Sequence, residues 1–320
     1  MRRVLVLGGT GWLGGAVVRA ALADGAEVVC LARGESGAVP DGARLVAADR
    51  RAADAYSGVA GPWDEVVEIA YQPELVGPAL DALASQASHW TLVSTISVYR
   101  RNDEPDADES AELVEPDDLT AYPDAKVAAE RATATAVGGR LLIVRPGLIA
   151  GPGDPSDRFG YWPARLHRGG RVLVPPTAAR YAQVIDVDDL AAFLVAAGRA
   201  ASTGTVNAVG DAVAMAAFLD EAAEVVGFTG QLATADDDWL LAHGVNYWAG
   251  PRSLPLWIPA EDAALMQRSN AAYRAAGGAL RPLADTLVRS LADELARGVT
   301  RPRRSGLTAE DEDELLAQLG

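Results

Sequence analysis

The sequence predicts an α/β fold built on a doubly wound parallel sheet. Through the first half of the chain, short apolar runs alternate with longer helical patterns. The expected strands are 4–7, 27–31, 44–47, 65–70, 90–94 and 141–144, and the expected helices are 12–24, 73–86 and 122–137. Continuous apolar strands separated by helices indicate a parallel sheet covered on both faces. Such sheets bind ligands outside the carboxyl ends of their strands.

The composition limits which partners the protein is expected to bind and where in the cell it is expected to be. The chain has 320 residues and a formal net charge of −16, which disfavours binding to nucleic acid and to anionic membrane surfaces. No apolar stretch reaches the roughly 18 residues that a membrane span needs. The single cysteine, Cys30, excludes an internal disulfide and reads as a small buried residue. We expect a cytoplasmic protein with a small-molecule substrate and no metal site.

A glycine-rich turn follows the first strand. After Leu7 come Gly8, Gly9, Thr10, Gly11, Trp12, Leu13 and Gly14. Glycines allow a tight turn from strand to helix, close approach of a pyrophosphate, and close packing of the helix on the strand. The amino end of the helix offers free N–H groups to the phosphates. These seven residues therefore predict a dinucleotide site in a Rossmann fold.

The second half of the chain is less regular. A Gly- and Pro-rich loop at 151–157 precedes a strand at 181–185, a helix at 188–198 and a strand at 205–209. We expect a dinucleotide-binding domain at 1–150, to which 181–210 returns, and a smaller substrate-binding region at 151–180 and 211–299. The tail at 300–320 is expected to be peripheral. Thr308 and Asp311 form a possible capping box for a short acidic helix within it.

The end of the second strand bears on the choice between NAD and NADP. Arg33 stands where NAD-preferring sites carry an acid that binds the ribose 2′-hydroxyl. A guanidinium fits a 2′-phosphate, so NADP(H) is favoured, although Glu35 could reach the ribose and NAD(H) stays open. Asp49, after the third strand, could accept a hydrogen bond from the adenine amino group or simply form a turn.

Two later segments supply catalytic chemistry. Hydroxyl groups at Ser94, Thr95 and Ser97 follow the fifth strand, and Tyr122 and Lys126 share one face of the next helix. A phenol titrates near pH 10, and a nearby ammonium favours its phenolate form. Tyr122 could then exchange a proton with a substrate oxygen that Thr95 polarises, while hydride moves to or from a nicotinamide.

These residues resemble the extended short-chain dehydrogenase/reductase family, also called the NAD-dependent epimerase/dehydratase family. The matching segments are GGTGWLG, VSTISVY, AYPDAKVAAE, RPGLIAGPGD and VIDVDDLA. The resemblance implies that Thr95, Tyr122 and Lys126 form the catalytic triad. It also implies that the cofactor is bordered by Ala70, Tyr71, Ser94, Lys126, Pro146 and Gly147. Family members often dimerise through the helix that carries the Tyr and Lys, so a homodimer is expected.

Departures from the family pattern narrow the reaction. Ile96 and Ser97 stand where nucleotide-sugar 4,6-dehydratases carry an Asp-Glu pair, so the groups for water elimination are missing. Arg33 suggests NADP, which usually enters and leaves with each turnover, whereas many epimerases keep NAD bound.

Three functions are compatible with these residues. The leading hypothesis is an NADPH-dependent reductase or dehydrogenase acting on a carbonyl or hydroxyl of a small organic molecule. Its candidate substrate residues are Tyr71, Gln72, Ser97, Tyr161, Trp162, Arg180, Tyr181 and Trp248. The second is a nucleotide-sugar epimerase with tightly bound NAD, in which Arg165, Arg168 and Arg180 could bind a diphosphate. The third, a non-catalytic dinucleotide sensor, is opposed by the intact triad.

Overall fold

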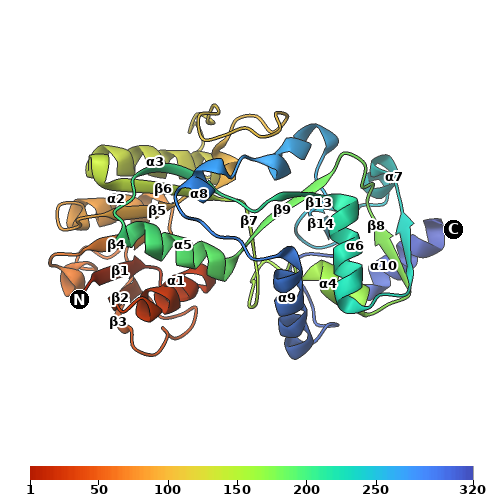
Figure 1. Cartoon of the computed structure of the whole chain (residues 1–320), viewed down its shortest axis with the longest axis horizontal. Helices are drawn as coiled ribbons and strands as arrows, with labels where there is room; N and C mark the ends of the chain where they lie inside the picture. The colour runs from red at the N-terminus through yellow and green to blue at the C-terminus, as the bar shows by residue number, and fades with distance from the viewer. Residues whose placement is uncertain (320) are drawn as a thin grey trace. The chain divides into compact units, whose positions relative to one another are not determined.

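The computed structural model describes residues 1–319, and its contacts divide the chain into two compact units (Figure 1). Unit 1 comprises Met1–Gly147, Val187–Gly210 and Arg268–Leu280. Unit 2 comprises Leu148–Asp186, Asp211–Gln267 and Arg281–Gly320. The predicted return of 181–210 to the first domain therefore begins only at Val187, and unit 1 gains a segment, 268–280, that the sequence did not suggest.

Unit 1 contains a seven-stranded parallel sheet, as the sequence predicts. In spatial order its strands are β10 (Gly204–Ala208), β6 (Leu141–Pro146), β5 (Trp90–Val93), β4 (Glu65–Glu68), β1 (Arg3–Leu7), β2 (Glu27–Ala32) and β3 (Arg44–Ala47). Leu5 in the centre pairs with Val29 on one side and Val66 on the other. All three are buried, which accounts for the continuous apolar runs.

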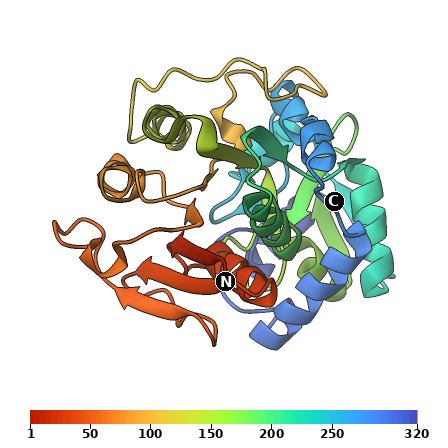
Figure 2. The same cartoon turned by 60° about the vertical axis from the view of Figure 1, so that its left-hand side comes forward.

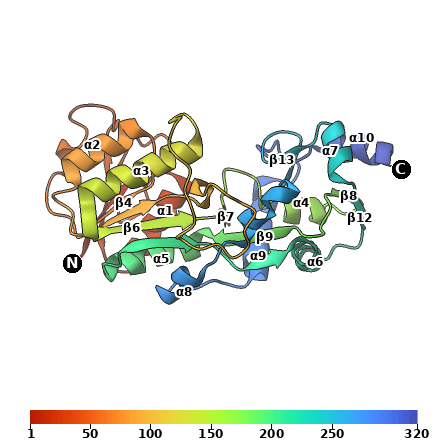
Figure 3. The same ribbon diagram turned by 90° about the horizontal axis from the view of Figure 1, so that it is seen from above.

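Helices cover the two faces of this sheet. α2 (Pro73–Leu83) packs beside α3 (Tyr122–Val137), and α1 (Trp12–Ala23) packs beside α5 (Val187–Arg199). Figure 2 shows α2 and α3 nearly end-on, in orange and olive, and Figure 3 shows them on the opposite side of the strands from α5. Shorter helices complete unit 1: η1 (Ser57–Val59), η2 (Ile96–Val98), η3 (Gly138–Arg140) and α8 (Ala271–Ala275).

β4 ends two residues earlier than predicted. Its last residue is Glu68, not Ala70. The side chain of Glu68 folds forward and its Oε1 accepts a hydrogen bond from the backbone N–H of Ala70 at 2.8 Å. The N–H of Ala70 is thus bonded to a side chain, which agrees with the strand ending at Glu68.

Unit 2 is built from small sheets and helices. β7 (Leu148–Ala150), β9 (Tyr181–Asp186) and β11 (Ala212–Ala214) form one sheet with β9 in the middle. β8 (Arg171–Val174) pairs with β12 (Gln231–Thr234), and β13 (Asn246–Trp248) pairs with β14 (Ser253–Pro255). The helices are α4 (Tyr161–His167), α6 (Met215–Val226), α7 (Asp237–Ala242), η4 (Ala260–Gln267), α9 (Leu283–Arg297) and α10 (Ala309–Leu319).

The tail is not peripheral, contrary to the expectation for 300–320; residue 320 lies outside the described part. Leu315 is fully buried in the core of unit 2. Glu312, also buried, pairs with Arg165 and accepts a hydrogen bond from the backbone N–H of Leu173 at 2.9 Å. The predicted capping box is formed, because the N–H of Asp311 donates to Thr308 Oγ1 at 3.0 Å and the N–H of Thr308 donates back to the carboxylate at 3.2 Å.

Within residues 1–319, no helix combines the length and apolar character needed to cross a membrane.

Candidate active site

The glycines of the glycine-rich turn have two roles: some are needed for the fold, and one leaves space for a ligand. Gly8 has φ = +103°, a conformation that favours glycine, and its carbonyl accepts a hydrogen bond from the N–H of Gly11 at 3.2 Å. A Cβ on Gly14 would overlap that same carbonyl, and a Cβ on Gly9 would overlap the sulfur of Cys30. The backbone conformation therefore favours glycine at position 8, and close packing requires it at positions 9 and 14. Burial raises the pKa of the Cys30 thiol to about 11, so this cysteine behaves as an apolar packing residue.

Gly11 differs from the other three. It precedes α1 with φ = −76°, which any residue can adopt, and the nearest atom to an added Cβ is the Gly8 carbonyl oxygen at 3.6 Å. Neither the backbone nor the packing demands glycine here, so the missing side chain leaves room for something outside the protein. The turn therefore fits a dinucleotide pyrophosphate lying against the amino end of α1.

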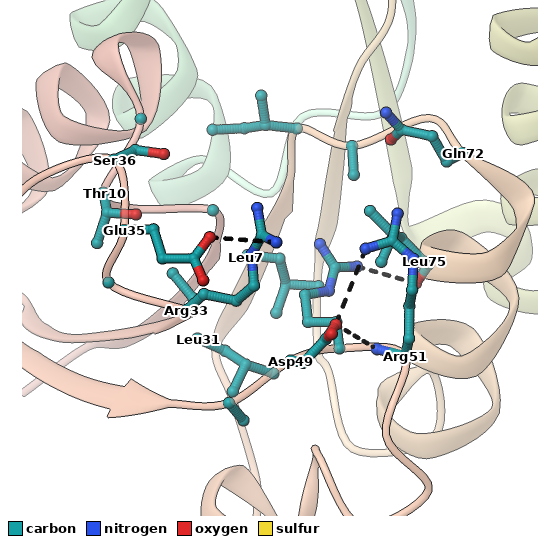
Figure 4. A pocket seen from close by; sticks show the side chains of 18 of the residues that line it. Leu7, Thr10, Leu31, Arg33, Glu35, Ser36, Asp49, Arg51, Gln72 and Leu75 are labelled. Carbon is teal, nitrogen blue, oxygen red and sulfur yellow. Dashed lines mark hydrogen bonds and ion pairs between the residues drawn. The ribbon is translucent and has the colours of Figure 1, made fainter.

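A pocket of about 370 Å³ opens beside this turn at the carboxyl ends of the central strands (Figure 4). Its lining includes Gly8, Thr10, Gly11, Arg33, Glu35, Asp49, Arg50, Arg51, Ala70, Tyr71 and Gln72. Most of the predicted cofactor residues from this half of the sheet thus meet in one place. Trp12 and Leu13 begin α1 and are partly exposed.

Two arginines occupy the rim of this pocket. Arg33 is half-exposed and lies 3.2 Å from Glu35, the two alternatives that the sequence left open for the ribose. Arg51, which the sequence analysis did not single out, extends over the same pocket and lies 3.3 Å from Glu74. Asp49 accepts a hydrogen bond from the backbone N–H of Arg51 at 3.0 Å, so it does form a turn. Figure 4 shows Arg33 turned to Glu35 and Arg51 beside Asp49.

Lys126 lies where two strands end. It is buried, and its Nζ donates to the carbonyl oxygens of Val93, the last residue of β5, at 2.7 Å and of Ile69, directly after β4, at 3.4 Å. Desolvation lowers its pKa to about 8, while the carboxylates of Glu68 and Glu130 oppose that shift.

Tyr122 lies one helical turn before Lys126 and is 43% exposed, so its ring can be reached from solvent. The Lys126 Nζ is 5.9 Å from the ring centre of Tyr122 and 5.0 Å from that of Tyr71. The two tyrosine rings meet edge to face at 5.0 Å. An ammonium and a phenol that solvent reaches thus lie next to the pocket that Tyr71 lines.

The hydroxyl groups after β5 form a local cluster. Thr95 Oγ1 accepts a hydrogen bond from the N–H of Ser97 and donates to Ser97 Oγ, both at 3.2 Å. The neighbouring Ser94 Oγ is buried without a hydrogen-bond partner among the described residues. Ile96 is buried, so the position where dehydratases carry an acid faces the protein interior.

The segment after β6 is fixed by packing. Pro146 ends the strand, and a Cβ on Gly147 would lie 3.1 Å from Val209 and 3.4 Å from Ile96. Arg145 just before it forms a buried ion pair with Glu130 at 2.7 Å.

A second buried ion pair, Arg50–Glu68, was missed by the sequence analysis. The available signal was a carboxylate at each end of the short strand Glu-Val-Val-Glu, together with an arginine directly after Asp49. Neither residue points to the other in the sequence.

Several predicted substrate residues lie in unit 2, and two need correction. Tyr161 is 2% exposed and Trp162 is fully buried; both belong to the core, where the Trp162 Nε1 donates to the Pro255 carbonyl at 2.8 Å. Packing accounts for both, and neither is proposed as a pocket residue. Arg180 pairs with Asp237, Tyr181 begins β9, and the ring of Trp248 lies 4.9 Å from the Arg158 guanidinium.

The diphosphate site suggested for an epimerase also needs correction. Arg165 and Arg168 both pair with Glu312 of α10. They anchor the carboxyl-terminal helix, so they are not proposed as diphosphate ligands. Within residues 1–319, no group of three or more His, Cys, Asp or Glu side chains is arranged to hold a metal ion.

Comparison with known proteins places the chain in a family. The model of the NAD dependent epimerase/dehydratase family matches residues 4–76 and 75–210. The chain is 30% identical over 234 residues to dTDP-6-deoxy-L-talose 4-dehydrogenase (NAD(P)(+)) of Kitasatospora kifunensis, covering 64% of this chain and 73% of the relative.

Solved structures share the fold. A putative epimerase from Burkholderia cenocepacia J2315 has a TM-score of 0.73 at 21% identity, covering 92% of this chain and 98% of its own. UDP-glucuronic acid 4-epimerase from Bacillus cereus, in complex with NAD, has a TM-score of 0.69 at 14% identity, covering 92% and 99%. This chain thus belongs to the NAD-dependent epimerase/dehydratase family, as an NAD(P)-dependent oxidoreductase of the extended short-chain dehydrogenase/reductase type.

Proposed function

We propose that this protein is an epimerase of sugar nucleotides. It oxidises a hydroxyl-bearing ring carbon to a keto sugar and, after the keto sugar has flipped to present its other face, reduces that carbon again. The observation that carries the chemistry is the position of Lys126, whose ammonium rests on the ends of β4 and β5 next to the accessible phenol of Tyr122. This replaces a substrate of unspecified class with a sugar nucleotide, as in the second hypothesis from the sequence.

The residues have separate roles in the proposed reaction. A bound NAD(P), held by the glycine turn and Lys126, would supply the hydride acceptor and donor for the sugar carbon. The phenolate of Tyr122 takes the hydroxyl proton as the carbonyl forms and gives it back on reduction. Thr95 Oγ1 keeps the hydrogen bond that it accepts from the N–H of Ser97, and its hydroxyl hydrogen turns from Ser97 Oγ to the same substrate oxygen. Lys126 favours the phenolate by its charge and uses a remaining N–H to hold the nicotinamide ribose.

A net dehydrogenase is the second candidate. It is favoured by the relative from Kitasatospora kifunensis, whose name describes a dTDP-sugar 4-dehydrogenase that uses NAD or NADP. The first half of the reaction is the same, but the keto sugar would leave before reduction. Both candidates need a sugar nucleotide, and neither needs the acidic pair of a dehydratase.

We also propose that the part of the pocket that would bind the adenosine of the cofactor can accept the 2′-phosphate of NADP. Arg33 and Arg51 both line the pocket and are about half-exposed, so both guanidinium groups can reach a 2′-phosphate. Their acidic neighbours Glu35, Asp49 and Glu74 would have to release them, which keeps NAD as a competitor.

The test is an incubation with dTDP- and UDP-hexoses in the presence of NAD⁺ or NADP⁺, with Tyr122→Phe as the inactive control. Absorbance at 340 nm reports net oxidation, and chromatography with NMR reports new epimers. Epimers without accumulating NAD(P)H support the epimerase, and stoichiometric NAD(P)H with a keto sugar supports the dehydrogenase. Reduction of unrelated carbonyl compounds, with no turnover of any sugar nucleotide, would overturn the proposed substrate class.

A further inference from the structure

Strand β4 carries two buried carboxylates, one at each end. Glu65 begins the strand and Glu68 ends it, and both are fully buried. They differ in their partners: Glu65 accepts a hydrogen bond from Thr91 Oγ1 at 2.9 Å, whereas Glu68 lies at the edge where ligands bind. Because Glu68 is a charged residue buried at the ligand-binding edge of the sheet, we expect a functional role for it.

The carboxylate of Glu68 accepts three hydrogen bonds. Both guanidinium NH₂ groups of Arg50 donate to its carboxylate, one of them at 3.0 Å, and the N–H of Ala70 donates at 2.8 Å. Arg50 lies in the turn after β3, and its guanidinium also donates hydrogen bonds to Tyr56 Oη at 3.1 Å and to the Leu75 carbonyl at 3.0 Å. Because a buried ion pair often adds no net stability over apolar residues of similar size, stability alone does not explain this one.

The pair is linked to Lys126 through a short turn. Glu68 fixes the N–H of Ala70, and the residue between them, Ile69, offers the carbonyl that accepts the Lys126 Nζ at 3.4 Å. Arg50, Ile69 and Ala70 also line the pocket beside the glycine turn. One chain of contacts therefore runs from the turn after β3, through Glu68, to the ammonium.

We propose that Glu68, clamped by Arg50, is a positioning residue for Lys126: its carboxylate fixes the turn on which the ammonium rests and supplies a negative charge that holds the ammonium protonated. The mechanistic importance of this pair rests on the proposed role of Lys126 in the reaction, but the physical link between the two groups does not.

The charges around Lys126 are few and identifiable. Glu130 of α3 is one turn away and paired with Arg145 of β6, Glu68 of β4 is paired with Arg50, and the rings of Tyr71 and Tyr122 flank the ammonium. Burial lowers the pKa of Lys126 to about 8, against the opposing effect of the two carboxylates. Removing the charge of Glu68 leaves the Arg50 cation unbalanced, so the Lys126 pKa should fall further.

The sequence makes this measurable, because Lys126 is the only lysine in the chain. Protein grown with ¹³C-labelled lysine gives one Cε signal, whose shift against pH reports the Lys126 pKa in the complete protein without substrate. Glu68→Gln should lower that midpoint by about one unit, in the range for loss of a nearby opposite charge. Glu65→Gln is the matched control, a buried glutamate at the far end of the same strand, and should leave the midpoint unchanged.

A second variant guards against loss of folding. If Glu68→Gln does not fold because Arg50 is left unpaired, Arg50→Gln/Glu68→Gln removes both charges and should lower the midpoint by a smaller amount. An unchanged Lys126 midpoint in the folded variant, or an equal fall in Glu65→Gln, would overturn the inference. Because the titration needs no turnover, it can succeed even if the sugar-nucleotide assay fails, and the converse also holds.

Discussion

Lys126 shows most clearly what one residue contributes here. The chain contains 28 Lys and Arg residues, and all of them except Lys126 are arginine. A guanidinium stays charged under all ordinary conditions, whereas a buried ammonium responds to its surroundings and presents a compact point charge. A lysine kept only at this position agrees with a role that depends on its charge and on hydrogen bonding at the ends of β4 and β5.

The arginines at the pocket rim lead to a prediction about cofactor choice. Arg33→Ala and Arg51→Ala should each weaken NADPH binding by roughly 1.5–3 kcal/mol, about 10- to 150-fold in Kd, through loss of a charged contact to the 2′-phosphate. NADH binding should hardly change. Fluorescence titration with both cofactors measures this, and Arg44→Ala, an exposed arginine at the start of β3, is the control. Equal weakening of both cofactors would contradict the assignment.

At the scale of elements, local patterns predicted more than long-range pairings. The glycine turn, the Tyr122–Lys126 helix face and the Thr308–Asp311 capping box depend on residues a few positions apart, and the fold and the capping box match the sequence. The Arg50–Glu68 ion pair depends on the strand order that brings the turn after β3 to the end of β4. The sequence around either residue therefore does not predict its partner. The tail was misjudged for the same reason, because its partners lie far away in sequence.

The β1–α1 turn gives a matched pair of substitutions. Gly14→Ala should destabilise the fold by about 1–3 kcal/mol, because its Cβ has no room beside the Gly8 carbonyl. Gly11→Ala should leave the free energy of unfolding within about 1 kcal/mol of the wild type, because backbone and space both allow it. It should nevertheless weaken dinucleotide binding at least tenfold.

Urea unfolding and cofactor titration of both variants measure these effects. The reverse pattern, in which Gly14→Ala is as stable as the wild type or Gly11→Ala binds the dinucleotide normally, would show that the division of roles among the glycines is wrong.

At the scale of the whole molecule, Glu65 couples stability to pH. Burial, the largest influence, raises its pKa from 4.5 to about 7, against opposing effects of Thr91 and Arg2. Between these values the folded chain keeps a proton that the unfolded chain has lost. Unfolding therefore releases a proton, and the free energy of unfolding falls as pH rises from about 4.5 to 7. Above that range this contribution stays constant.

Glu65→Gln should remove this dependence. Relative to the wild type, the variant should gain about 3 kcal/mol in free energy of unfolding between pH 4.5 and pH 8, the equivalent of the pKa difference. Urea unfolding of both proteins at several pH values measures the gap, in which pH effects common to the two proteins cancel. A gap that does not change with pH would rule out Glu65 as the group responsible.

The proposed reaction depends on a phenol that exchanges a proton while hydride moves. The most direct measurement is single-turnover absorbance at 340 nm for the wild type and Tyr122→Phe, with a sugar nucleotide that the wild type turns over. The variant should bind the dinucleotide with unchanged affinity and transfer hydride about 10²- to 10⁴-fold more slowly, the usual cost of losing acid–base help. Hydride transfer at the wild-type rate would contradict the central claim.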